Sequence, residues 1–267
     1  MASWSSNITN HRRVKFEYMR HYACVSADLI VTVTDHLCGF YKNIVLNTND
    51  KPQVKLIPNG FDKEIIEKTM GECSAIASKK NTSGNLELTH IGNITNGREE
   101  SLFEFLKIIG RLSTTLKSRI ILNFAGAVPP RVLKIVYKLT SDINFRYMGQ
   151  LSYEVALRLA AESDFVLHFG SKKFIDARST KIYEYAALKR PVISFNYGGE
   201  LDSFIKDFSI GYSLNLLEND EIDSVLTNIL VNKGDFEFKI NQFDYLNLAK
   251  SYQNQMLSLL VDESGDI

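Results

Sequence analysis

Short apolar runs alternate with amphipathic stretches through most of this 267-residue chain. From residue 85 to residue 216 there are about six apolar runs of five to seven residues, separated by roughly ten to eighteen residues with helical spacing. Strands and helices that alternate in this way form βαβ units, in which the strands run parallel. The pattern therefore predicts an α/β fold with one doubly wound parallel sheet.

Two flanking segments differ from this repeat. Residues 12–44 have the pattern of helix, strand and helix, and residues 53–62 that of a strand entering a Pro-Asn-Gly turn. These two or three strands are too few for a sheet of their own. Residues 68–85 are small and polar, which predicts a linker, whereas residues 220–262 have helical periodicity. The predicted divisions are therefore residues 1–67, a central domain at 68–219, and C-terminal helices at 220–267.

Charge and composition restrict the partners and the compartment. The 31 basic and 31 acidic residues cancel, so no overall field attracts nucleic acid. Cys24, Cys38 and Cys73 lack metal-ligand spacing, which predicts reduced thiols and no metal site. No apolar run has the form of a secretion signal or a spanning helix, so we expect a cytoplasmic protein. The basic residues 11–20 allow at most peripheral contact with the inner face of a membrane, and a solvated or packed helix face is the simpler interpretation.

Turns that allow close backbone approach follow four of the predicted strands. In an open parallel sheet, ligands bind at the carboxyl ends of the strands. The first such turn runs from Gly92 to Arg98, and the others lie at residues 125–127, 149–151 and 170–178. A helix that begins near Ser179 or Thr180 would present free N–H groups at the same edge, so a phosphate-bearing ligand suits this arrangement. For each glycine taken singly, an ordinary turn between strand and helix is the simpler interpretation.

Two carboxylates and two histidines lie near the same edge. Asp176 and Glu184 are eight positions apart, so both can face one ligand if a helix starts near Lys181. The simpler interpretation is that Glu184 complements the helix dipole and Asp176 is solvated. His90 and His168 end predicted strands, where a core histidine with a satisfied hydrogen bond is the commoner case.

Six stretches of the chain, in order, carry a family resemblance: "ADLIVTVTDHL", "KLIPNGFD", "IGNITNGR", "FAG", "FRYMGQLSYEVALRLAAESDFVLHF" and "STKIYEYAALKRPVISF". Over residues 20–260 the chain resembles retaining, nucleotide-sugar-dependent glycosyltransferases of the GT-B fold, family 4. The resemblance implies Rossmann-like domains, of which the C-terminal one binds the donor. It also implies transfer of a hexose-type residue from a nucleoside diphosphate sugar to a glycan or glycolipid acceptor, with no metal or other cofactor.

The resemblance assigns roles to individual residues. Asp176 and Glu184 match the family's two glutamates, of which the first contacts the donor sugar and the second the ribose hydroxyls. Arg98 and Asn93 match the two cations that hold the diphosphate. The remaining donor-binding positions are Gly92 in the same turn, Gln150 and Leu151 near the base, and Ser179, Thr180 and Lys181 at the distal phosphate.

The chain also departs from the family pattern. Asn93 stands where the family has a cation, Asp176 is one methylene shorter than glutamate, and Ala177–Arg178–Ser179 replaces a glycine-rich loop. Arg178 or Lys181 is expected to restore the lost positive charge. Residues 1–67 match only the end of the family's acceptor domain and its linker, so a separate chain carrying the rest of that domain is an expected partner. The alternatives are a non-catalytic nucleotide-sugar-binding subunit, a truncated inactive fragment, or a sugar-nucleotide epimerase, which shares the two-domain architecture.

Overall fold

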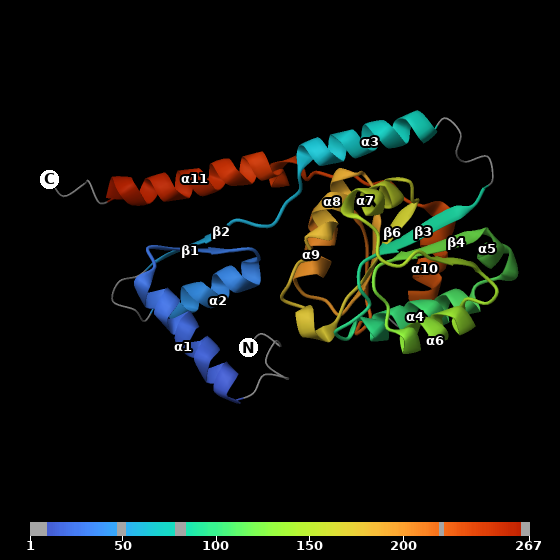
Figure 1. Ribbon diagram of the computed structural model, residues 1–267, viewed down its shortest axis with the longest axis horizontal. Helices are drawn as coiled ribbons and strands as arrows, with labels where there is room; N and C mark the ends of the chain where they lie inside the picture. The colour runs from blue at the N-terminus through green and yellow to red at the C-terminus, as the bar shows by residue number, and fades with distance from the viewer. Residues whose placement is uncertain (1–9, 47–51, 78–83, 219–221, 263–267) are drawn as a thin grey trace.

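The computed structural model describes residues 10–46, 52–77, 84–218 and 222–262. In Figure 1 a small N-terminal unit lies beside a larger domain that holds the main sheet. The larger domain contains six strands, all parallel, which confirms the predicted α/β fold. Its strands are β3 (Leu86–Ile91), β4 (Ile120–Ala125), β5 (Asn144–Tyr147), β6 (Phe165–Phe169), β7 (Val192–Asn196) and β8 (Gly211–Asn215).

The sheet has the order β5-β4-β3-β6-β7-β8, which creates a crevice at its centre. The chain builds β3, β4 and β5 outward in one direction and then returns to place β6, β7 and β8 on the other side of β3. Where the direction of winding reverses, the loops after neighbouring strands leave on opposite faces of the sheet. The carboxyl ends of β3 and β6 are therefore where a ligand is expected.

Helices cover both faces of this sheet (Figure 1). Two separate apolar cores lie on the two faces of the sheet, and β6 and β7 contribute alternating side chains to both, because successive residues of a strand point to opposite faces. One core packs against α4 (Arg98–Arg111), α5 (Thr114–Arg119), α6 (Pro130–Leu139) and α10 (Ile222–Asn232). The other packs against α3 (Lys63–Ala77), α7 (Tyr153–Ala161), α8 (Lys181–Ala187) and α9 (Glu200–Asp207).

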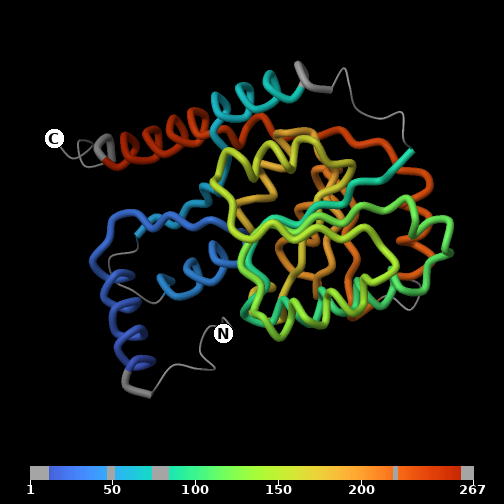
Figure 2. The backbone as a smooth tube through the Cα atoms, turned by 45° about the vertical axis from the view of Figure 1, so that its right-hand side comes forward, coloured from blue at the N-terminus to red at the C-terminus, as the bar shows by residue number. Residues whose placement is uncertain are grey.

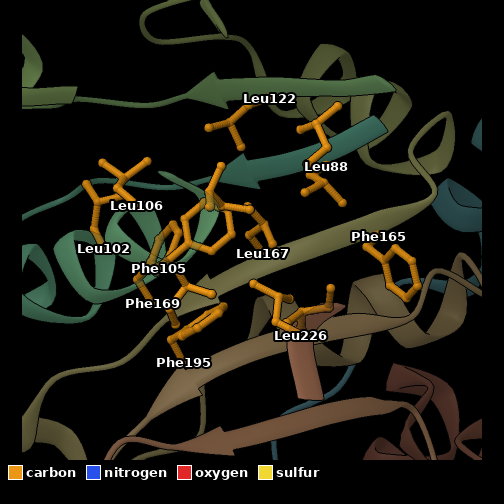
Figure 3. Packing of buried hydrophobic residues seen from close by; sticks show 14 of the residues in the cluster. Leu88, Leu102, Phe105, Leu106, Leu122, Phe165, Leu167, Phe169, Phe195 and Leu226 are labelled. Atoms are coloured by element: carbon orange, nitrogen blue, oxygen red, sulfur yellow. The ribbon is translucent and has the colours of Figure 1, made fainter. Parts of the chain in front are cut away.

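Aromatic rings fill the first of these cores. Phe105 of α4 packs between Phe169 of β6 and Phe195 of β7, with ring centroids 5.5 and 5.2 Å apart. Figure 3 shows these rings together beneath Leu102 and Leu106. Burial of such large apolar side chains anchors α4, so the turn before it is held in place at the crevice.

The small unit has only a limited core of its own. It consists of α1 (Asn10–Ser26), β1 (Leu29–Thr32), α2 (Asp35–Val45) and β2 (Gln53–Leu56), with β1 and β2 forming a two-stranded parallel sheet. Its buried apolar cluster contains Cys24, Cys38, Val45 and Val54. Several large apolar side chains of α1, among them Phe16, Tyr18 and Tyr22, remain exposed. A two-stranded sheet is marginal without further packing, so this unit depends on its neighbours.

Two predicted elements differ from the structure. The linker expected at residues 68–85 is largely helical, because α3 continues to Ala77 and packs on α7 through the second core; residues 78–83 lie outside the described ranges. The helical stretch predicted between the first two strands of the sheet is broken at Leu112, whose backbone is extended. Ser113 Oγ then caps α5 by accepting a hydrogen bond from the Leu116 amide at 3.3 Å.

The start of the C-terminal helix is hydrogen-bonded to the segment between β2 and α3. Phe61 forms an isolated parallel bridge with Asp244, and the Tyr245 amide donates to the Phe61 carbonyl at 3.0 Å. From there α11 (Tyr245–Asp262) projects toward the side of the molecule that holds the small unit (Figures 1 and 2).

Candidate functional site

The turns predicted to meet at one edge of the sheet do line one cavity. This cavity has a volume of about 580 Å³ and lies at the carboxyl ends of β3, β4 and β5. Of the residues proposed from sequence, it is lined by Gly92, Asn93, Gln150, Leu151, Thr180, Lys181 and Glu184. A second cavity of about 280 Å³ shares Gly92, Asn93 and Lys181 with the first and adds Arg98 and Ser179. Nine of the ten proposed residues therefore border one continuous region.

Two cations face this region from different helices. Lys181 is in the first turn of α8, and its Nζ donates to the Ile91 carbonyl at 3.1 Å. Arg98 begins α4 after Gly97, whose φ of 89° favours glycine. Its Nη1 donates to the Thr95 carbonyl at 3.3 Å, and its guanidinium lies 5.2 Å from the centre of the Phe174 ring. Burial lowers the pKa of both side chains, which shows that each charge is partly removed from water.

Glu184 is the carboxylate that lines the larger cavity. Its carboxylate accepts a hydrogen bond from the Tyr153 hydroxyl at 2.9 Å. Burial raises the pKa of Glu184, whereas the bond from Tyr153 and the charge of Lys181 lower it. Such a half-buried carboxylate still has acceptor capacity, so it can bind hydroxyl groups of a ligand.

Asn93 connects two of the turns. Its Oδ1 accepts a hydrogen bond from the Ala127 amide at 2.9 Å, so the turn after β3 is tied to the turn after β4. The same turns touch at Gly126, where φ is 131° and an added Cβ would lie 2.2 Å from the Gly92 carbonyl oxygen. Asn93 therefore shapes the cavity through its amide, in a position where a cation was the family expectation.

Asp176 is the one proposed residue that the structure does not bring to these cavities. Its carboxylate lies 3.6 Å from His36 Nδ1 of the small unit, and its carbonyl accepts from Thr34 Oγ1 at 3.3 Å. The neighbouring Ile175 and Ala177 line an adjoining cavity of about 380 Å³, so the loop itself flanks the site.

Arg178 does not supply the charge that Asn93 lacks. Its Nη2 donates to Glu200 Oε2 at 2.8 Å, and its Nη1 donates to the Tyr183 hydroxyl at 3.1 Å. Of the two cations that sequence offered, Lys181 is the one that faces the shared region of both cavities.

Sequence reasoning missed Tyr153 and gave the histidines a minor place. Tyr153 lines the larger cavity and holds Glu184, and its only sequence signal is its position just after the Gln150–Leu151 turn. His90 and His168 both line the smaller cavity. His90 is buried, as expected for a core histidine, but its Nε2 has no hydrogen-bond partner.

The described part of the chain holds neither a metal-ligand cluster nor a membrane-spanning helix. There, no group of three or more His, Cys, Asp or Glu side chains is arranged to hold a metal ion. Within the same ranges, no helix combines the length and apolar character needed to cross a membrane.

The fold and the position of the site define a class of architecture. A doubly wound parallel sheet whose crevice is lined by backbone turns, two cations and one carboxylate is a Rossmann-like nucleotide-binding arrangement. No protein-family model and no curated protein sequence matches the chain.

Solved structures do match the fold of this chain, and a glycosyltransferase is among them. WaaG, a glycosyltransferase involved in lipopolysaccharide biosynthesis, is 17% identical with a TM-score of 0.59, and the match covers 86% of this chain and 65% of WaaG. Anabaena HepE, solved with UDP-glucose, is 12% identical with a TM-score of 0.67 over 97% of this chain and 70% of HepE. A UDP-forming trehalose-phosphate synthase from Burkholderia xenovorans is 10% identical with a TM-score of 0.63 over 93% and 64% of the two chains.

These similarities establish the fold, which is the Rossmann-like fold of GT-B proteins. The chain spans about two thirds of the length of each of these three structures.

Proposed function

We propose that this chain is a nucleotide-sugar-dependent glycosyltransferase, or the donor-binding part of one. One observation carries the proposal: Arg98 of α4 and Lys181 and Glu184 of α8 border two cavities that share lining residues at the crevice of the sheet. The two cations suit a diphosphate, and the carboxylate suits the hydroxyls of a ribose. Among proteins of this fold, HepE has been solved with UDP-glucose, which supports a donor of this class.

In this proposal each part of the site has a separate task. Arg98 and Lys181 hold the diphosphate, together with the backbone of Gly92, Asn93, Ser179 and Thr180. Glu184, held by Tyr153, binds the ribose, and the backbone near Gln150 and Leu151 contacts the base. The larger cavity, at about 580 Å³, has the size expected for a small-molecule site.

The proposed reaction transfers the sugar with retention at its anomeric carbon. The bond between that carbon and the diphosphate oxygen breaks, and the electron pair leaves with the diphosphate. A new bond then forms from the anomeric carbon to the oxygen of a hydroxyl on a glycan or glycolipid acceptor, and the proton of that hydroxyl passes to the departing diphosphate. Arg98 and Lys181 stabilise the negative charge that develops on the departing diphosphate, so no metal or other cofactor is needed in this mechanism. Asp176 orients the donor sugar from the loop that flanks the cavity.

Partners and compartment complete the proposal. A separate chain carrying the rest of an acceptor domain would cover the exposed apolar side chains of α1. The enzyme acts in the cytoplasm, with at most peripheral contact with a membrane.

Thermal stability in the presence of nucleoside diphosphate sugars tests the donor site. A ligand that binds only the folded state stabilises it by about 2.7 kcal/mol at a concentration of 100 times its Kd. We expect at least one such sugar to raise the melting temperature, and Arg98→Ala or Glu184→Ala to reduce the effect. Arg111→Ala is the matched control, because Arg111 lies at the opposite end of α4 and is paired with Asp223. If both site variants respond like the wild type, the proposed site is wrong.

A second candidate is a non-catalytic subunit that binds nucleotide sugars. The pairing of Asp176 with His36, away from the cavities, favours it, as does the structural use of Asn93. The two candidates differ in turnover: a transferase releases nucleoside diphosphate in an acceptor-dependent manner, whereas the subunit binds the donor without releasing it.

A further inference from the structure

The smaller cavity has an excess of positive charge and contains two imidazoles. It lies at the ends of β3 and β6, and its lining includes His90, His168, Arg98 and Lys181. Across the ranges that the structure describes, no aspartate or glutamate borders it. A cavity of about 280 Å³ with this lining suits a compact anion.

The backbone determines where the neutral His90 ring carries its proton. Nδ1 lies 3.0 Å from the Leu167 carbonyl oxygen, and a carbonyl only accepts, so Nδ1 is the protonated nitrogen. Nε2 then carries the lone pair, and among the described residues this buried atom has no hydrogen-bond partner. The ring is held between the aromatic rings of Phe124 and Phe169, at centroid distances of 5.4 and 4.9 Å. An unpartnered buried nitrogen at the wall of a polar cavity indicates that its partner comes from a ligand.

Every neighbouring element affects the charge of His90. The pKa of His90 is lowered to about 4, mainly by burial and also by the charges of Lys181 from α8 and Arg98 from α4, while the Leu167 and Gly92 carbonyls favour the charged form. On β6, His168 is neutral as well, because burial lowers its pKa to about 3. Tyr185 of α8 also lines the cavity, but its hydroxyl donates to the Ile91 carbonyl at 3.2 Å. Both imidazoles are therefore neutral at pH 7 in the free protein.

We propose that the diphosphate of a bound nucleotide sugar enters this cavity together with one proton, which His90 takes up at Nε2. His90 thereby becomes a third cation of the site only while the ligand is bound. This inference rests on the proposed function and specifies how its diphosphate is held.

The electrostatics support such a switch. One negative charge about 4 Å from a partly buried ring raises the pKa by roughly 3 units at an effective dielectric constant of about 20. Starting from about 4, this shift brings the pKa of His90 close to neutrality. The protonated Nε2–H then donates to a phosphate oxygen, while the empty site avoids placing a third charge beside Arg98 and Lys181.

Calorimetric titration with UDP-glucose tests the coupling. Its diphosphate is a diester, so the ligand itself has no phosphate group that titrates near neutrality. In buffers of different ionisation enthalpy at about pH 6.5, we expect uptake of about one proton on binding. Binding should weaken by up to ten-fold per pH unit between the pKa of His90 in the free protein and its pKa in the complex. His90→Gln is expected to abolish the uptake and flatten the pH dependence. His168→Gln, the matched variant at the second buried imidazole, is expected to retain both.

Direct observation of the imidazole makes the test independent of these variants. In the wild-type protein, NMR titration of the His90 ring should show a higher pKa with UDP-glucose than without it. UDP-glucose binding without proton uptake, or uptake that persists in His90→Gln, overturns this inference but leaves the proposed function standing. If no nucleoside diphosphate sugar binds, the proposed function fails, and the titration is repeated with sulfate, a dianion that does not titrate in this range. A rise in the His90 pKa with sulfate then supports the proton-coupled anion site, and an unchanged pKa overturns it.

Discussion

Replacement of Arg178 by alanine should test how the loop beside the site is held. The Arg178 side chain is only 8% exposed, and its ion pair with Glu200, itself 10% exposed, has a length of 2.8 Å. The guanidinium also donates to the Tyr183 hydroxyl and lies 4.4 Å from the centre of the Phe204 ring. These contacts connect the loop before α8 to the start of α9.

The expected magnitude follows from what the substitution leaves behind. Without Arg178, the Glu200 carboxylate stays buried and loses its closest cation, although it keeps other described contacts. One of them is the hydrogen bond from the His36 amide to Oε1, at 2.6 Å. Removal of one partner from a buried ion pair costs about 3–5 kcal/mol, because the other charge is left uncompensated. For a chain of this size that corresponds to a fall in melting temperature on the order of 10 °C.

Calorimetric or circular-dichroism melting of three variants measures the effect. Arg178→Ala is compared with Arg178→Met combined with Glu200→Leu, which removes both charges and should be less destabilising than the single change. Arg111→Ala is the exposed control, since its pair with Asp223 is largely in solvent and should matter little. A fall of less than about 2 °C for Arg178→Ala, or a double variant as unstable as the sum of its single changes, would refute the reasoning.

Three further predictions concern the site and the small unit. Burial raises the pKa of Glu184, so its contribution to stability is largest at low pH and is lost as pH rises through the raised pKa. Between about pH 4 and 7, the melting temperature of Glu184→Gln should therefore fall less than that of the wild type. Gly126→Ala should destabilise the protein by about 2–4 kcal/mol in denaturant titrations, because the new Cβ would collide with backbone. In Gly110→Ala, a matched change in α4, the new Cβ meets no atom within 4 Å, so this variant should be more stable by about 0.5–1 kcal/mol. Equal effects of the two changes would contradict this prediction. Glu200→Ala should speed hydrogen exchange at the His36 amide, and unchanged protection there would show that this bond does not hold α2.

Much of the fold follows from local sequence patterns. Each predicted strand from residue 85 to 216 is present, because apolar runs of this length are stable only as buried strands covered by helices on both faces. The convergence of Gly92, Arg98 and Lys181 could be predicted as well, since the carboxyl ends of parallel strands must lie at one edge.

Other features depend on contacts between residues distant in sequence. The segment after residue 68 has a polar composition typical of a linker, yet α3 extends into it because Met70 and Cys73 pack against the core that α7 and α8 line. The hydrogen bond between Tyr153 and Glu184 joins residues 31 positions apart, and no local pattern indicates it.

For this protein, the sequence by itself determined the order of strands and helices, the parallel sheet and the set of turns that meet at its edge. Only the tertiary structure decided which side chains enter the cavity: Lys181 does, Arg178 pairs with Glu200, and Asp176 faces the small unit. The physical reason is that periodicity encodes which face of an element is buried, whereas the partner of a charged side chain depends on competition among groups brought together by folding.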